Sequence, residues 1–156
     1  MIRVNVFSEE KAWSKKLKNE DLFFKKVCKA FPKKYQFLNK KVSFSVLLSN
    51  NKNIKKLNKK FRNKDKPTDV LTFPFEKKFN IKKNCYLGDI VISYDYIHKP
   101  KILNNLDFKK KVIKVFIHGF LHLLGYDHVK IKDYKKMTKE EENIYNNIKL
   151  KIAELV

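Results

Sequence analysis

Three histidines in the C-terminal third of the chain have the spacing needed to bind one metal ion. They are His118, His122 and His128, in the segment VFIHGFLHLLGYDH. His118 and His122 are four residues apart, so on a helix their imidazoles project from one face, about 6 Å apart. Gly125 follows, and a glycine can adopt the left-handed conformation that ends a helix and lets His128 return toward the first two rings. The segment therefore predicts one ion, most simply zinc, bound at a helix end.

A zinc ion with three protein ligands keeps a fourth tetrahedral position open, which is typical of catalytic sites. Such an ion polarises a substrate oxygen and lowers the pKa of a bound water to about 7. The spacing is also that of metzincin peptidases, but Gly119 stands where zinc peptidases have their general-base glutamate. Peptidase chemistry is therefore disfavoured, and we expect Gly119 to leave space for a backbone or a substrate to approach the metal. Nickel or copper would also suit these nitrogens.

The charge of the chain points to a polyanionic partner. It has 37 Lys and Arg against 16 Asp and Glu, a formal net charge of +21, which favours nucleic acid first. Abundant lysine, asparagine and isoleucine are also expected from codons rich in A and T, so charge alone does not prove RNA binding. Only Arg3 and Arg62 are arginine. Arg62 is our candidate for bidentate binding of a phosphate, with an ordinary surface cation as the alternative.

Composition predicts a single domain, 1–156, because the chain has no repeat and no Pro/Gly/Ser-rich break. No run of about 18 apolar residues occurs, and nothing suggests export, so we expect a cytoplasmic protein. Cys28 and Cys85 lie far apart, which suits a reducing compartment. His98 has no partner at ligand spacing and is interpreted as a loop or surface residue. The aromatic residues are interpreted mainly as core, which makes a base-stacking platform the weaker interpretation.

Hydrophobic periodicity predicts strands and helices that interleave along the chain. Strands are predicted at residues 2–7, 41–48, 69–73 and 87–93. Helices are predicted between the first two strands with a break near Asn19, after Asn51 with Ile54, Leu57 and Phe61 on one side, from 106 to 124, and from a start between 133 and 138 toward residue 155. Thr138 and Glu141 have the spacing of a capping box for the last helix.

This pattern predicts an α/β or α+β fold in which a mixed sheet of about four strands packs against helices. The predicted helix at 106–124 carries a wide apolar stripe and no full charge from Val115 onward. We therefore expect it to be the central buried helix, with the metal site at its C-terminal end.

Three motifs, LNKKFRNKDKPTDVLTFPF, LGDIVIS and HGFLHLLGYDH, occur in this order and closely resemble the YbeY family over roughly residues 57–137. The resemblance implies an α/β domain, a zinc ion held by three histidines, and metal-dependent endoribonuclease activity in maturation of the 16S ribosomal RNA 3′ end and in ribosome quality control. It matches His118, His122 and His128 to the ligands, and Arg62 to an arginine across the cleft from the metal. Thr72 departs mildly from a common serine, and the first 50 residues match weakly.

We therefore expect an endoribonuclease with one Zn²⁺ per chain that acts on single-stranded ribosomal RNA of the small subunit. A metal ion and a planar guanidinium can share the charge that develops on phosphoryl oxygens. Asp127, Asp69 and Asp89 are expected to have structural roles, although Asp127 could also orient a ligand. Two alternatives stay open: an RNA-binding ribosome-assembly factor whose metal mainly stabilises the fold, and a metallopeptidase.

Overall fold

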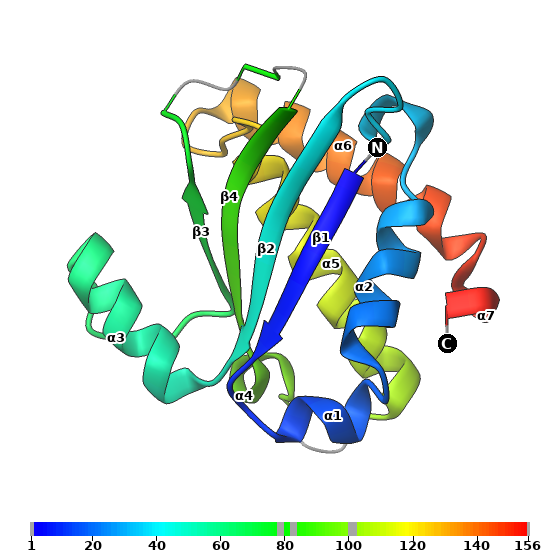
Figure 1. Ribbon diagram of the computed structural model, residues 1–156. Helices are drawn as coiled ribbons and strands as arrows, with labels where there is room; N and C mark the ends of the chain where they lie inside the picture. Colours follow the sequence, from blue (N-terminus) through cyan, green and yellow to red (C-terminus); the bar gives the residue numbers. More distant parts are fainter. Residues whose placement is uncertain (1, 78–79, 82–83, 100–102, 156) are drawn as a thin grey trace.

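The strands form one mixed sheet with the order β1-β2-β4-β3. The computed structural model describes residues 2–77, 80–81, 84–99 and 103–155 (Figure 1). Its strands are β1 (Ile2–Ser8), β2 (Lys41–Ser49), β3 (Val70–Pro74) and β4 (Asn84–Ser93). β2 is parallel to both β1 and β4, whereas β3 runs antiparallel to β4. β3 is consequently an edge strand.

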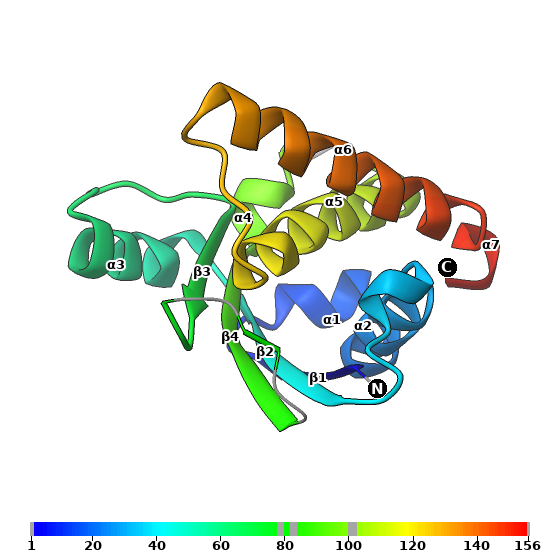
Figure 2. The same ribbon diagram turned by 90° about the horizontal axis from the view of Figure 1, so that it is seen from above.

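The helices are distributed unequally over the two faces of the sheet. They are α1 (Ala12–Lys16), α2 (Glu20–Lys29), the 3₁₀ helix η1 (Lys33–Tyr35), α3 (Asn51–Arg62), α4 (Tyr94–Ile97), α5 (Asn105–Leu123), α6 (Ile131–Lys149) and α7 (Ile152–Leu155). α5 lies between the sheet and α6, with α1 and α2 beside it (Figure 2). α3 packs on the opposite face through Ile54, which contacts Leu71 and Val91 in a small separate core.

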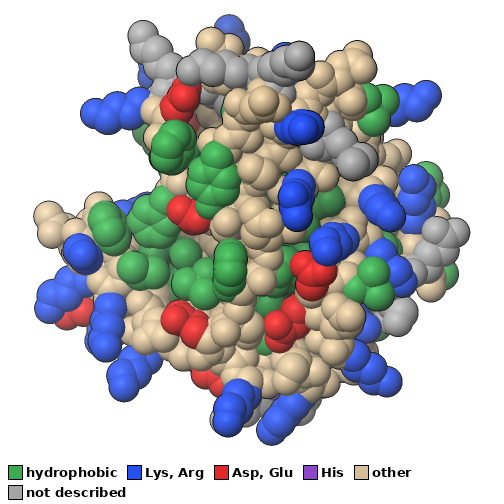
Figure 3. Space-filling view, viewed as in Figure 1, with side chains coloured by type: hydrophobic (Ala, Val, Ile, Leu, Met, Phe, Trp, Pro, Cys, Tyr) green, Lys and Arg blue, Asp and Glu red, His purple; other side chains and the backbone are tan. Residues whose placement is uncertain are grey.

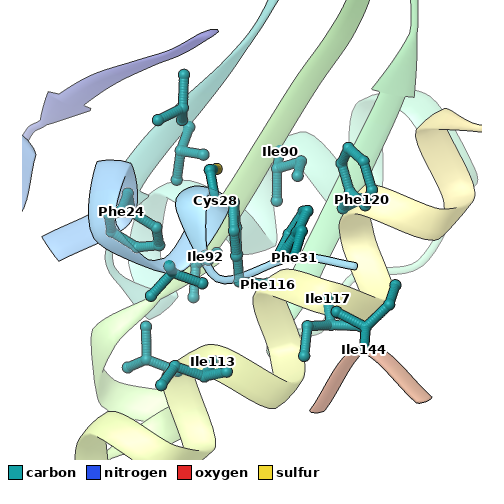
Figure 4. Packing of buried hydrophobic residues seen from close by; sticks show 14 of the residues in the cluster. Phe24, Cys28, Phe31, Ile90, Ile92, Ile113, Phe116, Ile117, Phe120 and Ile144 are labelled. Carbon is teal, nitrogen blue, oxygen red and sulfur yellow. The ribbon is translucent and has the colours of Figure 1, made fainter. Parts of the chain in front are cut away.

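α5 is buried along most of its length, as its apolar stripe predicts. Phe116 contacts rings from two other elements, with centroid distances of 5.0 Å to Phe24 of α2 and 5.8 Å to Phe44 of β2. Figure 4 shows Phe116 and Phe120 of α5 among aliphatic and aromatic side chains of the core, including Phe24, Phe31 and Ile90. Burying each large apolar side chain contributes about 1.5–3 kcal/mol. This packing fixes the position of α5 on the sheet, and with it the position of the helix end.

The predicted fold class is confirmed, and both predicted boundaries of the last helix are wrong. The break near Asn19 is found, since the Asn19 side chain accepts the Leu22 N–H at 2.9 Å and begins α2. α6 begins at Ile131, before the predicted start, so Thr138 lies inside the helix and the predicted capping box is absent. α6 also ends at Lys149, and a turn separates it from α7. No described helix is long and apolar enough to cross a membrane.

Candidate metal centre and its cleft

The three predicted histidines converge at the C-terminal end of α5. The helix stops at a turn in which Gly125 has a φ of +89°, the left-handed conformation that the sequence predicts. The Gly125 N–H donates to the carbonyl of His122 at 3.0 Å. The turn returns His128 to the helix end, where ring centroids are 4.6 Å apart for His118 and His122, 5.4 Å for His118 and His128, and 5.0 Å for His122 and His128.

The ring nitrogens have the separations that one metal ion requires. Nε2 of His118 and Nε2 of His122 are 3.1 Å apart. Two nitrogens bound to one tetrahedral zinc at 2.0–2.1 Å are separated by about 3.3 Å. One nitrogen from each of the three histidines, His128 included, lies within 4.8 Å of the others. The three residues could therefore hold one ion with little rearrangement.

The remaining nitrogens of two of these rings are held by oxygen acceptors. Nδ1 of His118 lies 2.5 Å from Oε1 of Glu141, a residue of α6. Nδ1 of His122 lies 2.9 Å from the backbone carbonyl oxygen of Tyr126. A carbonyl oxygen only accepts, so Nδ1 of His122 carries the proton and Nε2 presents its lone pair. Such partners fix the ring orientation and raise the basicity of a metal ligand.

The environment of His122 favours the neutral imidazole. Burial lowers its pKa below the usual 6.5, and the neighbouring His118 lowers it further, whereas the hydrogen bond to Tyr126 acts in the opposite direction. A neutral ring is the form that binds a metal, because protonation removes the lone pair.

The histidines open onto a cleft of about 630 Å³, within the range of about 300–1,000 Å³ that small-molecule sites occupy. Its lining comes from the end of α3, the chain leading into and along β3, α5, and the chain before α6: Phe61, Arg62, Thr68, Asp69, Val70, Leu71, Thr72, Phe73, His118, His122, Asp127, His128 and Val129. Arg62, which is exposed, makes no ion pair with any acid in the described part of the chain. An exposed guanidinium thus lines the same cleft as the three imidazoles.

The three aspartates considered in the sequence analysis have structural partners. Oδ1 of Asp127 accepts the backbone N–H of His128 at 2.7 Å. Oδ1 of Asp69 accepts the backbone N–H of Val70 at 2.8 Å, at the start of β3. Asp89 accepts a tyrosine hydroxyl at 2.6 Å. These contacts agree with the structural roles that we expect for the three acids.

Gly119 has a different role from the one predicted. A Cβ at this position would lie 2.9 Å from Cγ2 of Ile90 and 3.3 Å from Cγ2 of Thr72. Gly119 therefore faces the sheet, and the space it leaves is filled by side chains of β4 and β3 instead of a backbone or a substrate. The prediction of space toward the metal is wrong. A glutamate could not be placed here without moving α5 away from the sheet.

Comparison with known proteins identifies the family. The family model described as Endoribonuclease YbeY matches residues 6–149. The chain belongs to the YbeY family. Among proteins named Endoribonuclease YbeY, one from Pelagibacter ubique is 65% identical over 153 residues, covering 98% of this chain and all of that protein. Another, from Persephonella marina, is 38% identical over 138 residues, covering 87% of this chain and 90% of that protein.

A solved structure is also similar. The solution structure of TM1509 from Thermotoga maritima is 30% identical in sequence, with a TM-score of 0.48, and the match covers 97% of this chain and 93% of that one. The family assignment made from three motifs is confirmed by the family model and the sequence relatives. The assignment of His118, His122, His128 and Arg62 to roles in this YbeY-family chain stays a prediction.

Sequence patterns missed the contact of Glu141 with His118. Glu141 was interpreted as a capping residue, yet it interrupts the buried stripe of α6 formed by Met137, Ile144 and Ile148. A carboxylate that lies in line with buried apolar residues at helical spacing needs a hydrogen-bond partner. The position of Glu141 in this stripe was therefore the sequence signal that could have predicted its contact.

The structure also shows the surroundings of Phe61 and His98. Phe61 was predicted to lie on one side of its helix with Ile54 and Leu57; Ile54 is buried, whereas Phe61 is exposed at the cleft. His98 follows α4 in a bend, so it is a loop residue as expected, and it is half-buried with its ring centroid 5.8 Å from that of Phe108.

Proposed function

We propose that this chain is a zinc-dependent endoribonuclease that cuts single-stranded RNA, with His118, His122 and His128 as the zinc ligands. The observation that carries the proposal is the convergence of the three imidazoles on a cleft that Arg62 also lines. Membership of the YbeY family, whose relatives are named endoribonucleases, supports an RNA substrate. The net charge of +21 supports binding to a polyanion.

Each group in the cleft has a role that follows from its contacts. When bound, zinc supplies a Lewis acid that polarises a phosphoryl oxygen and activates the attacking hydroxyl. Glu141 and the Tyr126 carbonyl hold the rings of His118 and His122, so that both Nε2 lone pairs point to one place. Arg62 binds the non-bridging oxygens of the scissile phosphate through its planar fork and stabilises the charge of the transition state. The nucleophile is water or the adjacent 2′-hydroxyl.

We further propose that the substrate is ribosomal RNA in the cytoplasm. The resemblance to the YbeY family implies maturation of the 16S ribosomal RNA 3′ end and a part in ribosome quality control, with the small ribosomal subunit as partner. Mapping the ends of RNA cut by the purified protein tests this assignment.

The activity is tested with protein purified without chelator or metal-affinity resin and then loaded with zinc. Wild type should cut a ribosomal RNA precursor, and His122→Ala should abolish cutting while the thermal melt stays cooperative. His98→Gln is a control, because His98 lies outside the cleft. Cutting by the His122→Ala variant at the wild-type rate would refute the proposal.

One observation keeps the alternative of a ribosome-assembly factor with little catalysis. The ligands join the end of α5 to the chain that leads into α6, so a bound ion would also tie two elements together. Chelation separates the two functions: loss of cutting with a small fall in Tm supports the enzyme, and a large fall in Tm without any cutting in the loaded protein supports the assembly factor. A metallopeptidase is disfavoured, because Gly119 packs on the sheet where a general base would stand.

A further inference from the structure

Phe61 is an exposed aromatic side chain on the wall of the cleft. It continues the apolar side of α3 after Ile54 and Leu57, but Ile54 is completely buried whereas Phe61 is 57% exposed. The difference arises because the C-terminal end of α3 extends past the edge strand β3, so the last apolar residue faces the cleft instead of the sheet (Figure 1).

The ring of Phe61 is held in place and still has a free surface. Its centroid lies 5.2 Å from that of Phe73, with an angle of 68° between the rings. This edge-to-face contact leaves at least one face of Phe61 uncovered by Phe73. Nζ of Lys60 lies 5.3 Å from the ring centroid. Figure 3 shows hydrophobic side chains gathered over α3, β3 and β4 beside a hollow at the left edge of the molecule.

The end of α3 is fixed to the chain that follows it. Asn63 ends the helix in the left-handed conformation, with a φ of 54°. The side chain of Asn58, which is buried, donates to the carbonyl of Lys66 at 2.8 Å. Phe61 therefore lies on a supported surface, which lowers the conformational entropy lost when a ligand stacks on it.

The side chains around Phe61 have the chemistry needed to bind one nucleotide, an aromatic ring for the base and cations for the phosphate. Arg62 comes next in the chain and lines the same cleft, and Lys60 and Lys64 are exposed cations on either side. Aromatic rings beside cations are the common means of binding single-stranded nucleic acid, because the rings stack on bases and the cations bind phosphates. Val129, 82% exposed, lines the cleft from the chain before α6. Phe61 and Val129 therefore line one cleft from two different segments, and a base could enter that cleft between them.

We propose that Phe61 stacks on an unpaired base adjacent to the phosphate bound by Arg62, and that this contact makes the enzyme selective for single-stranded RNA. The proposal rests on the proposed endoribonuclease function and adds the group that selects the substrate. A base within a duplex is already paired and stacked, so its face is closed to Phe61 unless the duplex opens.

The test compares three variants of the full chain. Phe61→Leu keeps an apolar side chain against Phe73 but removes the aromatic face, and Phe61→Tyr keeps the ring. Phe75→Leu is the matched control. Phe75 is an exposed phenylalanine (70%) that directly follows β3, but it does not line the cleft. Fluorescence anisotropy measures the binding of a short single-stranded RNA, of the same RNA with one abasic nucleotide at successive positions, and of a duplex.

Wild type should bind the single strand more tightly than the duplex, and one abasic position should weaken binding. Phe61→Leu should weaken binding of the single strand roughly 5- to 150-fold, the range measured when a stacking residue is removed, and should lose the abasic effect. Phe61→Tyr and Phe75→Leu should bind as wild type does. Cooperative thermal melts of all variants show that folding is intact.

The proposal is overturned if Phe61→Leu binds the single strand as tightly as wild type, or if it keeps the full abasic effect. Equal weakening of single strand and duplex also overturns it, since the contact would then not depend on an unpaired base. Cleavage is measured separately on the same RNA. Absence of cleavage by wild type together with intact base discrimination would refute the proposed enzymatic activity alone. Normal cleavage by wild type together with a Phe61→Leu variant that keeps the full abasic effect would refute the stacking role alone.

Discussion

Glu141 offers a sharp test of the metal centre, because its carboxylate contacts a predicted ligand without being one. Oε1 of Glu141 lies 2.5 Å from Nδ1 of His118. Glu141→Gln keeps an oxygen that can accept from Nδ1 but removes the negative charge, and Glu141→Ala removes both. Both changes should therefore weaken zinc binding while leaving the three imidazoles in the chain.

The magnitude follows from the geometry. The carboxylate oxygen would stand about 6 Å from an ion bound on the far side of the imidazole, given a zinc–nitrogen bond of about 2.0 Å. Coulomb's law for charges of −1 and +2 at this distance gives about 1 kcal/mol in water and about 5 kcal/mol at an effective dielectric constant of 20. The side chain is partly exposed, so the lower half of this range applies. We expect about tenfold weaker zinc binding for Glu141→Gln and about 100-fold for Glu141→Ala, the range typical of such partners of metal-bound histidines.

The assay is a competition between the protein and a chromophoric chelator for zinc at pH 7, with thermal melts of the metal-free proteins in parallel. Glu142→Gln is the matched control, since it removes the same charge from an exposed neighbour on α6. Zinc affinities that are equal in wild type, Glu141→Gln and Glu142→Gln would refute the positioning role. Equal losses for Glu141 and Glu142 would show that only overall charge matters.

Three further perturbations test the packing, the charges and the cleft. Gly119→Ala should lower the free energy of unfolding, measured by urea denaturation, by about 1–2 kcal/mol. The new Cβ would lie 2.9 Å from Cγ2 of Ile90, and this overpacking outweighs the gain in helix propensity. A variant more stable than wild type would contradict the close contact. Burial disfavours ionisation of Glu140, but hydrogen bonding from Tyr35 holds its pKa below the usual 4.5. The stability that the ionised Glu140 contributes is therefore complete above about pH 4.5 and is lost as the pH falls through the lower folded pKa. The difference in Tm between wild type and Glu140→Gln should consequently shrink in acid. A difference in Tm that stays constant with pH would exclude this linkage. Arg62→Lys should slow cleavage roughly 100-fold at an unchanged Tm, because lysine keeps the charge and loses the planar fork; an unchanged rate would remove Arg62 from the catalytic site.

Much of the fold follows from local patterns in the sequence. The apolar stripe of the predicted helix at 106–124 and the glycine after it define α5 and its end within about one residue. Strand alternation locates β1 and β2, while the start of β4 lies three residues earlier than predicted, at Asn84. The error at α6 has a plain cause: Lys130, which provides no side-chain cap, precedes the helix, so no capping signal marks its start.

The sequence by itself determined the elements whose geometry is local: two histidines one helical turn apart, a helix that ends at Gly125, and the motifs of the YbeY family. Only the tertiary structure decided which groups from distant segments meet them. Glu141 reaches His118 because α6 packs against α5, and Phe61 and Arg62 line the same cleft as the histidines because α3 extends past the edge of the sheet. The spacing of apolar residues along the sequence shows which side of a helix is apolar, because side chains share a face every 3.6 residues. The contacts between elements, however, depend on the packing of many side chains together. No short stretch of sequence contains that information.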